Sequence, residues 1–279
     1  MNYFTMGYWV LGLALGVSAA GAVVGLACVR QSTLSVTARF RMVWLTAAAV
    51  SIGGVGTWLT VYVTMLGVGV STGEIRYDIT AMVVAALIAV AAVLAGLLIA
   101  GRESTLARVI GGGAVMGIGI GVMHMLAMGA VRVQGSADVN IWLSVAAGAL
   151  AVATSIGLLW ATTHTRSILL LAGVAVLYAL AITAVHYLGQ AGLHVDLDSA
   201  SGEPDGEDLF TLFVPVFVVG TLSLAVPITA VLVAPDRTGT TRSRQLAQAA
   251  QHTNAQNTNS AAPQADSPRP GGRVPQPIG

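Results

Sequence analysis

The residues of this sequence best suited to chemistry are two histidines with soft or polar neighbours. The first, His124, stands in the segment MHMLAM (residues 123–128). On a helix His124 and Met128 are four residues apart and share a face, and Met123 lies beside them. An imidazole nitrogen combined with thioether sulfurs is a soft ligand set, which suits copper, and Cu(I) especially, better than calcium, magnesium or manganese. The spacing therefore predicts a copper site.

The second histidine, His186, is followed by Tyr187 in the segment VHYLGQ (185–190). It offers a second nitrogen ligand, and the tyrosine offers a hydroxyl next to the ligands. A neutral imidazole inside a membrane needs a partner for its nitrogens, so hydrogen-bonded packing is the alternative interpretation of each histidine alone. Their matching positions in an internal repeat favour the ligand role.

That repeat is carried by three segments of similar pattern, GGVGTWLTVYVTML (53–66), MGIGIGVMHMLAMG (116–129) and YALAITAVHYLGQA (178–191). When His124 is set against His186, Val61 occupies the equivalent position of the first segment. The spacing from Val61 to His124 is nearly equal to the spacing from His124 to His186. Because each interval covers two apolar runs, the sequence predicts three tandem helix pairs.

The elements that position these residues are apolar runs long enough to cross a membrane. The chain of 279 residues is 55% hydrophobic and 9% charged, with a mean hydropathy of +0.79, whereas soluble domains carry about 25% charged residues. We therefore expect an all-α, polytopic membrane bundle of seven transmembrane helices, made of three tandem helix pairs plus a seventh helix. The expected spans are Tyr8–Val29, Met42–Val70, Ile79–Ala100, Arg108–Val131, Ile141–Ala161, Ser167–Gly189 and Phe210–Val233.

The few charges predict a direction for the bundle. All thirteen basic residues are arginines, and in a seven-span topology eleven of them lie on one side while only Arg76 and Arg132 lie on the other. The positive-inside rule then places the N-terminus outside and the C-terminus in the cytoplasm. Spans two, four and six run outward, so His124 and His186 should share one depth near the outer face.

The composition also excludes several classes of protein and divides the chain. The net charge of +1 argues against a nucleic-acid partner, and the lack of lysine excludes a retinal pump, which needs a lysine Schiff base. We expect a six-helix membrane domain (1–190), an acidic external loop (191–209), a seventh transmembrane helix (210–233) and a disordered cytoplasmic tail (234–279). His194 lies in the acidic loop, where a solvated role is favoured over metal capture.

The three segments resemble the motif of the MHYT family of bacterial integral membrane sensors, in which a Met-His-Tyr-Thr motif recurs in alternate membrane helices. The second segment supplies Met123, His124 and Met128, and the third supplies His186 and Tyr187 with Gly189 after them. The first keeps Tyr62 and Met65, but Val61 stands where a histidine belongs. The resemblance implies a metal, proposed to be copper, at the outer face. It also implies a sensor of a diatomic gas such as oxygen, carbon monoxide or nitric oxide.

With two of the three motif histidines present, the expected site is a single Cu(I) held by two histidines and two or three methionines. Its predicted ligands are His124, His186, Met123, Met128 and Met65, with Tyr62 and Tyr187 next to them. Two other interpretations remain open. One is a membrane electron carrier with haem between His124 and His186, and the other is a metal-free structural or partner-binding membrane subunit.

The expected function is therefore signalling at the bacterial plasma membrane by a protein that is not an enzyme. The family's common output domains do not occur in the sequence, which resembles a stand-alone and divergent member. Its expected partners are the lipid bilayer, a diatomic gas and a cytoplasmic signalling protein that receives the signal in trans, without nucleic acid.

Overall fold

The structure, a computed structural model, describes residues 6–68, 75–102, 105–165, 167–197, 202, 204–233 and 251. Within these residues seven helical stretches are long and apolar enough to cross a membrane, which confirms the predicted class of fold. The second stretch joins three helical segments end to end, and the others are single helices. They are α1 (Trp9–Leu34), α2–η1–α3 (Ala38–Ala49, Val50–Leu59 and Thr60–Met65), α4 (Ile79–Ala100), α5 (Leu106–Gly129), α6 (Ile141–His164), α7 (Ile168–Ala191) and α8 (Leu209–Val233).

The helices at the arginine-rich end extend further than the apolar runs predict. Helix α1 continues past Arg30 to Leu34, and α2 begins at Ala38, ahead of the expected start at Met42. Arginine has a long apolar stem that can cover the helix while its guanidinium reaches water, so an arginine does not have to end a membrane helix. A short polar cap marks the boundary here instead: the Thr37 side chain accepts a hydrogen bond from the backbone N–H of Phe40.

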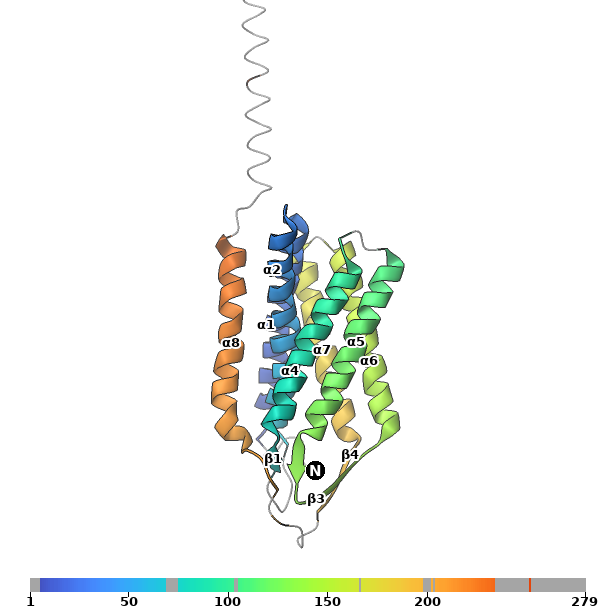
Figure 1. Cartoon of the computed structure of the whole chain (residues 1–279), viewed down its shortest axis with the longest axis vertical. Helices are drawn as coiled ribbons and strands as arrows, with labels where there is room; N and C mark the ends of the chain where they lie inside the picture. The colour runs from blue at the N-terminus through green and yellow to red at the C-terminus, as the bar shows by residue number, and fades with distance from the viewer. Residues whose placement is uncertain are drawn as a thin grey trace, which may run out of the picture. The chain divides into compact units, whose positions relative to one another are not determined.

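Six of the seven stretches form a closed ring in chain order. Each packs on the next, from α1 to α2 and η1, then α4, α5, α6 and α7, and α7 returns to α1. The last helix, α8, contacts α1 and η1 on the outside of this ring, and Figure 1 shows it at the side of the bundle. The segments that carry the three motifs, α3 with η1, α5 and α7, also contact one another across the ring. The predicted arrangement of three helix pairs plus one helix is thus present.

The second stretch contains ten residues of π-helix, η1, where the sequence predicts only a regular helix. Here Thr57 Oγ1 donates a hydrogen bond to the carbonyl of Ile52, five residues earlier, at 2.8 Å. The backbone of η1 lies directly against α1: a Cβ at Gly21 would fall 2.4 Å from the backbone nitrogen of Gly56. Ser18 Oγ donates to the Gly56 carbonyl at 2.6 Å across the same contact. The glycines here serve close helix packing, as expected.

A buried hydrogen bond joins η1 to α7. Thr57 Oγ1 and the hydroxyl of Tyr178 lie 2.6 Å apart, and both residues are buried. Since the Thr57 hydroxyl proton is already given to the Ile52 carbonyl, the Tyr178 hydroxyl must donate this bond. The two residues therefore form a relay from α7 to the π-helical backbone.

Because Tyr178 donates this hydrogen bond to Thr57, removing the two hydroxyl groups should reduce the free energy of unfolding by different amounts. Thr57→Val leaves the Tyr178 hydroxyl buried without an acceptor and should lower the free energy of unfolding by about 1–3 kcal/mol. Tyr178→Phe leaves Thr57 bonded to Ile52 and should cost about 1 kcal/mol or less. Thermal unfolding of the purified variants in detergent measures both, and a larger loss for Tyr178→Phe would contradict the assigned direction.

Four short strands at one end of the bundle connect loops that are far apart in sequence. Strand β1 (Ile75–Tyr77) pairs with β2 (Val131–Val133), and β3 (Gly135–Val139) pairs with β4 (Leu193–Leu197), both antiparallel. Figure 1 shows strands gathered at one end of the helices. Strand β4 lies in the first part of the predicted acidic loop (191–209), where the sequence predicts no strand, because its partner β3 is distant in the chain.

The charges of the described residues separate between the two ends as predicted. At the end opposite the strands lie Arg30, Arg39, Arg41, Arg102 and Arg108, whereas Arg76 and Arg132 lie on the strands. The Arg102 guanidinium donates to the carbonyls of Thr33 and Ser35, which fastens α4 to the turn between α1 and α2. The chain divides into two units after Val233. The second, which holds the predicted tail, lies outside the described residues except for Gln251.

Candidate metal centre

The two motif histidines meet inside the bundle. His124 on α5 and His186 on α7 have ring centroids 5.4 Å apart, and the rings lie edge to face at 87°. His124 is 2% exposed and His186 is fully buried. The prediction that the repeat brings these two side chains together is confirmed by this contact.

Both histidines lie at the same distance from the strand end of their helices. His124 is five residues before the end of α5 at Gly129, and His186 is five residues before the end of α7 at Ala191. At a rise of about 1.5 Å per residue, each lies roughly 7–8 Å inside its helix end. The equal depth follows from the repeat, which places both histidines in helices of the same direction.

The imidazole nitrogens of the pair have no hydrogen-bond partner within the described part of the chain. This holds for Nδ1 and Nε2 of both His124 and His186. A neutral imidazole carries one donor and one acceptor, and leaving such groups buried and unpaired is costly. Four orphaned nitrogens around one contact are therefore a reason to look for a ligand there.

The imidazole of His124 lies against the α-carbon of Gly189 on α7. A Cβ at Gly189 would fall 2.1 Å from Nε2 of His124, a distance that real Cβ atoms do not show. Glycine thus leaves room for the ring, which occupies the place that the Cβ of any other residue would take. Gly189 stands in the third motif segment, where its residue type alone does not distinguish this contact from ordinary helix packing.

The predicted methionine ligands are buried, but they are not equal in position. Met128 shares the face of His124 one turn further along α5, and Met123 and Met65 are also inside the core. Met125, which stands where the family motif has tyrosine, is 38% exposed and faces away from the core. Met123, Met128 and Met65 are thus buried, whereas Met125 is not, and coordination by any of them stays a prediction.

The two predicted tyrosines have different surroundings. Tyr187 contacts the ring of His186 edge to face, with centroids 5.7 Å apart, so it lies next to the histidine pair as expected. Tyr62 is buried and stacks between Trp58, at 5.8 Å, and Phe213 of α8, at 6.4 Å. Its ring contacts thus connect the first motif with the seventh spanning helix.

Among the described residues, no group of three or more histidine, cysteine, aspartate or glutamate side chains could hold a metal ion. A site made from these residues must therefore use two imidazoles together with softer or weaker ligands. His194 lies on β4 opposite Asp138 of β3, and its Nδ1 is 3.4 Å from the Gly192 carbonyl. Its position on the surface layer agrees with the solvated role.

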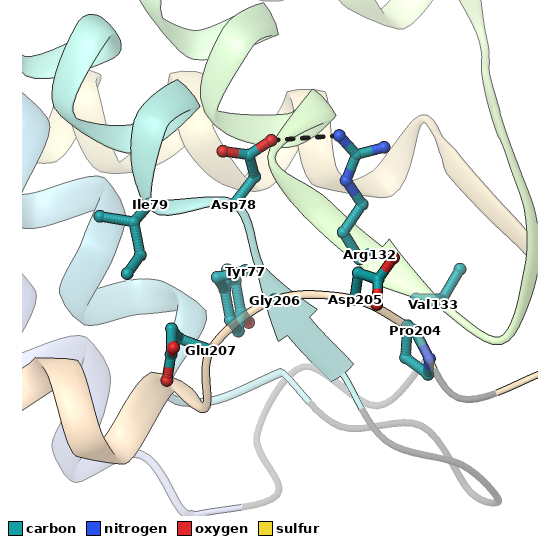
Figure 2. Close-up of a pocket in the computed structure, with 9 residues that line it drawn as sticks. All are labelled: Tyr77, Asp78, Ile79, Arg132, Val133, Pro204, Asp205, Gly206 and Glu207. Carbon is teal, nitrogen blue, oxygen red and sulfur yellow. Dashed lines mark hydrogen bonds and ion pairs between the residues drawn. The ribbon is translucent and has the colours of Figure 1, made fainter.

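A separate hollow of about 600 Å³ opens at the strand end. Figure 2 shows Arg132 and Asp78 paired on one side of it and Glu207 on the other. An Arg132 guanidinium nitrogen lies 3.1 Å from an Asp78 carboxylate oxygen. Hydrogen bonds from the backbone N–H of Ala81 and from Arg132 lower the pKa of the Asp78 carboxyl. Both side chains are open to solvent, so the pair adds little stability, and neither motif histidine lines this hollow.

The wall of this hollow depends on one glycine. Tyr77 of β1 exchanges two backbone hydrogen bonds of 3.0 Å with Glu207. Beside that bridge Gly206 has φ +136°, and a Cβ there would lie 2.9 Å from the Tyr77 carbonyl oxygen. Only glycine allows both the conformation and the close approach. This contact fastens the chain just before α8 to the strand layer.

Comparison with known proteins identifies the repeat. The family model MHYT, described as a bacterial signalling protein N terminal repeat, matches residues 54–113 and again residues 117–175. The two matches begin at residues 54 and 117, and this spacing equals that between Val61 and His124. The chain contains two MHYT repeats. No curated protein and no solved structure matches it.

The MHYT repeats cover the first two motifs, while His186 in the third lies beyond the matched residues. The structure nevertheless places this third motif against the second, because His186 contacts His124. The protein is thus a multi-pass membrane protein with an MHYT signalling domain. Its third motif, which the family model does not match, is linked to the second by the contact of His186 with His124.

The residues at the centre fit a soft metal ion. The orphaned imidazole nitrogens of His124 and His186 supply two neutral donors. Buried thioethers of α5 and α3 belong to the same core. This donor set suits Cu(I), whereas it lacks the carboxylates that harder ions prefer.

Proposed function

We propose that this MHYT protein is a non-enzymatic membrane sensor that binds one Cu(I) ion through His124 and His186. The observation that carries the proposal is the contact of two deeply buried imidazoles whose four nitrogens lack hydrogen-bond partners among the described residues. Met128, Met123 and Met65 are the proposed thioether ligands, and Tyr187 orients His186 through its ring contact.

A Cu(I) ion held by these residues would supply the position at which a diatomic gas such as oxygen, carbon monoxide or nitric oxide binds. The chain's own residues exclude water from the centre, since both histidines are buried among apolar side chains. Tyr62 contacts Phe213 of α8, and we propose this contact as the route by which a change near the motifs reaches the seventh spanning helix and a cytoplasmic partner.

The proposed site faces the outside of the bacterial plasma membrane. The support is the distribution of charge: in the described chain five arginines lie at the end opposite the strands and two lie on the strands. The positive-inside rule then places the strand layer, and with it the nearby histidines, at the outer face.

The testing experiment is metal analysis of the protein purified from membranes and loaded with Cu(I) under reducing conditions. Wild type should retain about one equivalent, whereas the double variant His124→Ala, His186→Ala should retain less than a tenth of that amount. The matched control is His164→Ala, His194→Ala, which removes two histidines away from the centre and should bind copper like wild type. Equal copper in wild type and the His124/His186 variant would refute the proposal.

The haem alternative makes a different prediction in the same preparation. Haem held by both histidines must place its plane between the two rings, which here contact each other edge to face at 5.4 Å. We therefore expect no Soret band in wild-type protein expressed with haem supply. A Soret band that the double variant lacks would favour the electron-carrier interpretation instead.

A further inference from the structure

Gly189 of α7 lies directly against the imidazole of His124. The missing Cβ would lie 2.1 Å from Nε2 of His124, but 2.9 Å from Cδ2 and 3.2 Å from Cε1. Because the two carbon atoms that flank Nε2 are at similar, longer distances, the ring points its Nε2 corner at the place that a Cβ of Gly189 would take. The contact therefore involves the end of the His124 side chain, rather than the backbone of α5.

The internal repeat provides a comparison for this glycine. Three residues after each motif position stand Thr64, Ala127 and Gly189, and all three are buried. The bundle thus accommodates a Cβ at this register in the first two repeats. Helix packing alone does not require glycine here, so the reason for glycine at 189 is the imidazole that lies against it.

The ring of His124 is also held from another side. The His186 ring contacts it edge to face, and His124 is only 2% exposed. A side chain at residue 189 would have to displace the imidazole within a closed core. Cores of this density do not absorb an added methyl group without movement of the neighbouring side chain.

We infer that Gly189 is a positioning residue, whose lack of a side chain fixes the His124 imidazole beside His186. Its role in metal affinity rests on the proposed function, whereas its control of the ring position does not. Replacement by alanine should therefore weaken metal binding by moving a ligand, although Gly189 itself contributes no ligand atom.

The first test compares two glycines of the same helix. Gly189→Ala should lower the affinity for Cu(I), measured by competition with a chromogenic chelator, by tenfold or more. Gly173→Ala is the matched control, since a Cβ at Gly173 meets nothing within 4 Å, and its affinity should stay within twofold of wild type. Wild-type affinity in Gly189→Ala would overturn the inference.

The second test needs no metal and uses thermal unfolding in the presence of a chelator. Gly189→Ala should lower Tm in the wild-type background, because the methyl group and the ring compete for one place. In the His124→Ala background the same substitution should cost little, since the ring is gone. An equal loss of Tm in both backgrounds, or failure of both Gly189→Ala proteins to fold, would show that the glycine serves the backbone and would overturn the inference.

The two tests separate this inference from the proposed function. If wild-type protein binds no Cu(I), the proposed function fails, but the stability cycle still decides whether Gly189 positions His124. If wild type binds Cu(I) and the cycle shows no coupling, the proposed function survives and the positioning role is wrong.

Discussion

Replacement of both motif histidines by leucine is expected to stabilise the metal-free protein. Each imidazole of His124 and His186 buries two nitrogens without partners in the described chain, and such groups cost about 1–3 kcal/mol when they are left unsatisfied. In a membrane the unfolded helices also lie in an apolar environment, which reduces the difference. For the double variant His124→Leu, His186→Leu we expect a gain of about 1–3 kcal/mol in the free energy of unfolding.

Binding of Cu(I) should make wild type more stable than the double leucine variant, which is the reverse of their order without metal. A ligand that binds only the folded state stabilises it by about 4 kcal/mol at a concentration 1,000 times its Kd. Wild type with Cu(I) should then unfold above the leucine variant, while without metal it unfolds below. Thermal unfolding in detergent, with a chelator or with Cu(I), measures both orders.

The control for this experiment is His194→Leu, because His194 is on the strand layer and outside the core. Its substitution should change stability by less than about 0.5 kcal/mol in either condition. A metal-free leucine variant less stable than wild type would show that the two histidines are packing residues. The metal-free structural interpretation would then be preferred.

The largest loss of stability is expected from Gly21→Ala on α1. The added Cβ would lie 2.4 Å from the nitrogen and 2.7 Å from the α-carbon of Gly56, and 2.6 Å from the Ser51 carbonyl oxygen. All three atoms are backbone, so no side chain can turn away, and α1 must separate from η1. We expect a loss of about 3 kcal/mol or more, at the upper end for overpacked cores.

The matched control is Gly16→Ala on the same helix. Gly16 is exposed, and a Cβ there meets nothing within 4 Å, so alanine should be neutral or should stabilise by up to about 1 kcal/mol. The fraction of monodisperse protein after heating, followed by size-exclusion chromatography in detergent, compares the two variants. Similar behaviour of both would contradict the close contact between α1 and η1.

The helices could be predicted from sequence because a lipid environment imposes their length and polarity. Seven apolar runs of about 20 residues admit few other folds. The residues at which the helices begin and end could be predicted less closely, because Arg30, Arg39 and Arg41 lie within helices rather than beyond them. The π-helix had no sequence signal, because its hydrogen-bond register depends on contacts with α1, which follow only from the packed bundle.

The meeting of the two histidines was predictable from repeat and direction together. Equivalent repeat positions set His124 and His186 at one depth, and both lie on helices that run in the same direction. The contact of Gly189 with the His124 ring was not predictable, since glycines throughout the chain also serve ordinary helix packing. The strand layer was missed because its pairs join distant loops, as Ile75 with Val133 and Asp138 with His194.

The return of α7 to α1 limits how this architecture can grow. In an open stack of repeats a further unit can be added at either end, and the binding surface lengthens with each copy. Here every helix of the six already has two neighbours, so no free edge remains for a fourth pair within the described bundle. Any additional helix has to lie outside the closed set, which is where α8 is found. A fourth helix pair could therefore join the ring only by separating helices that now contact each other.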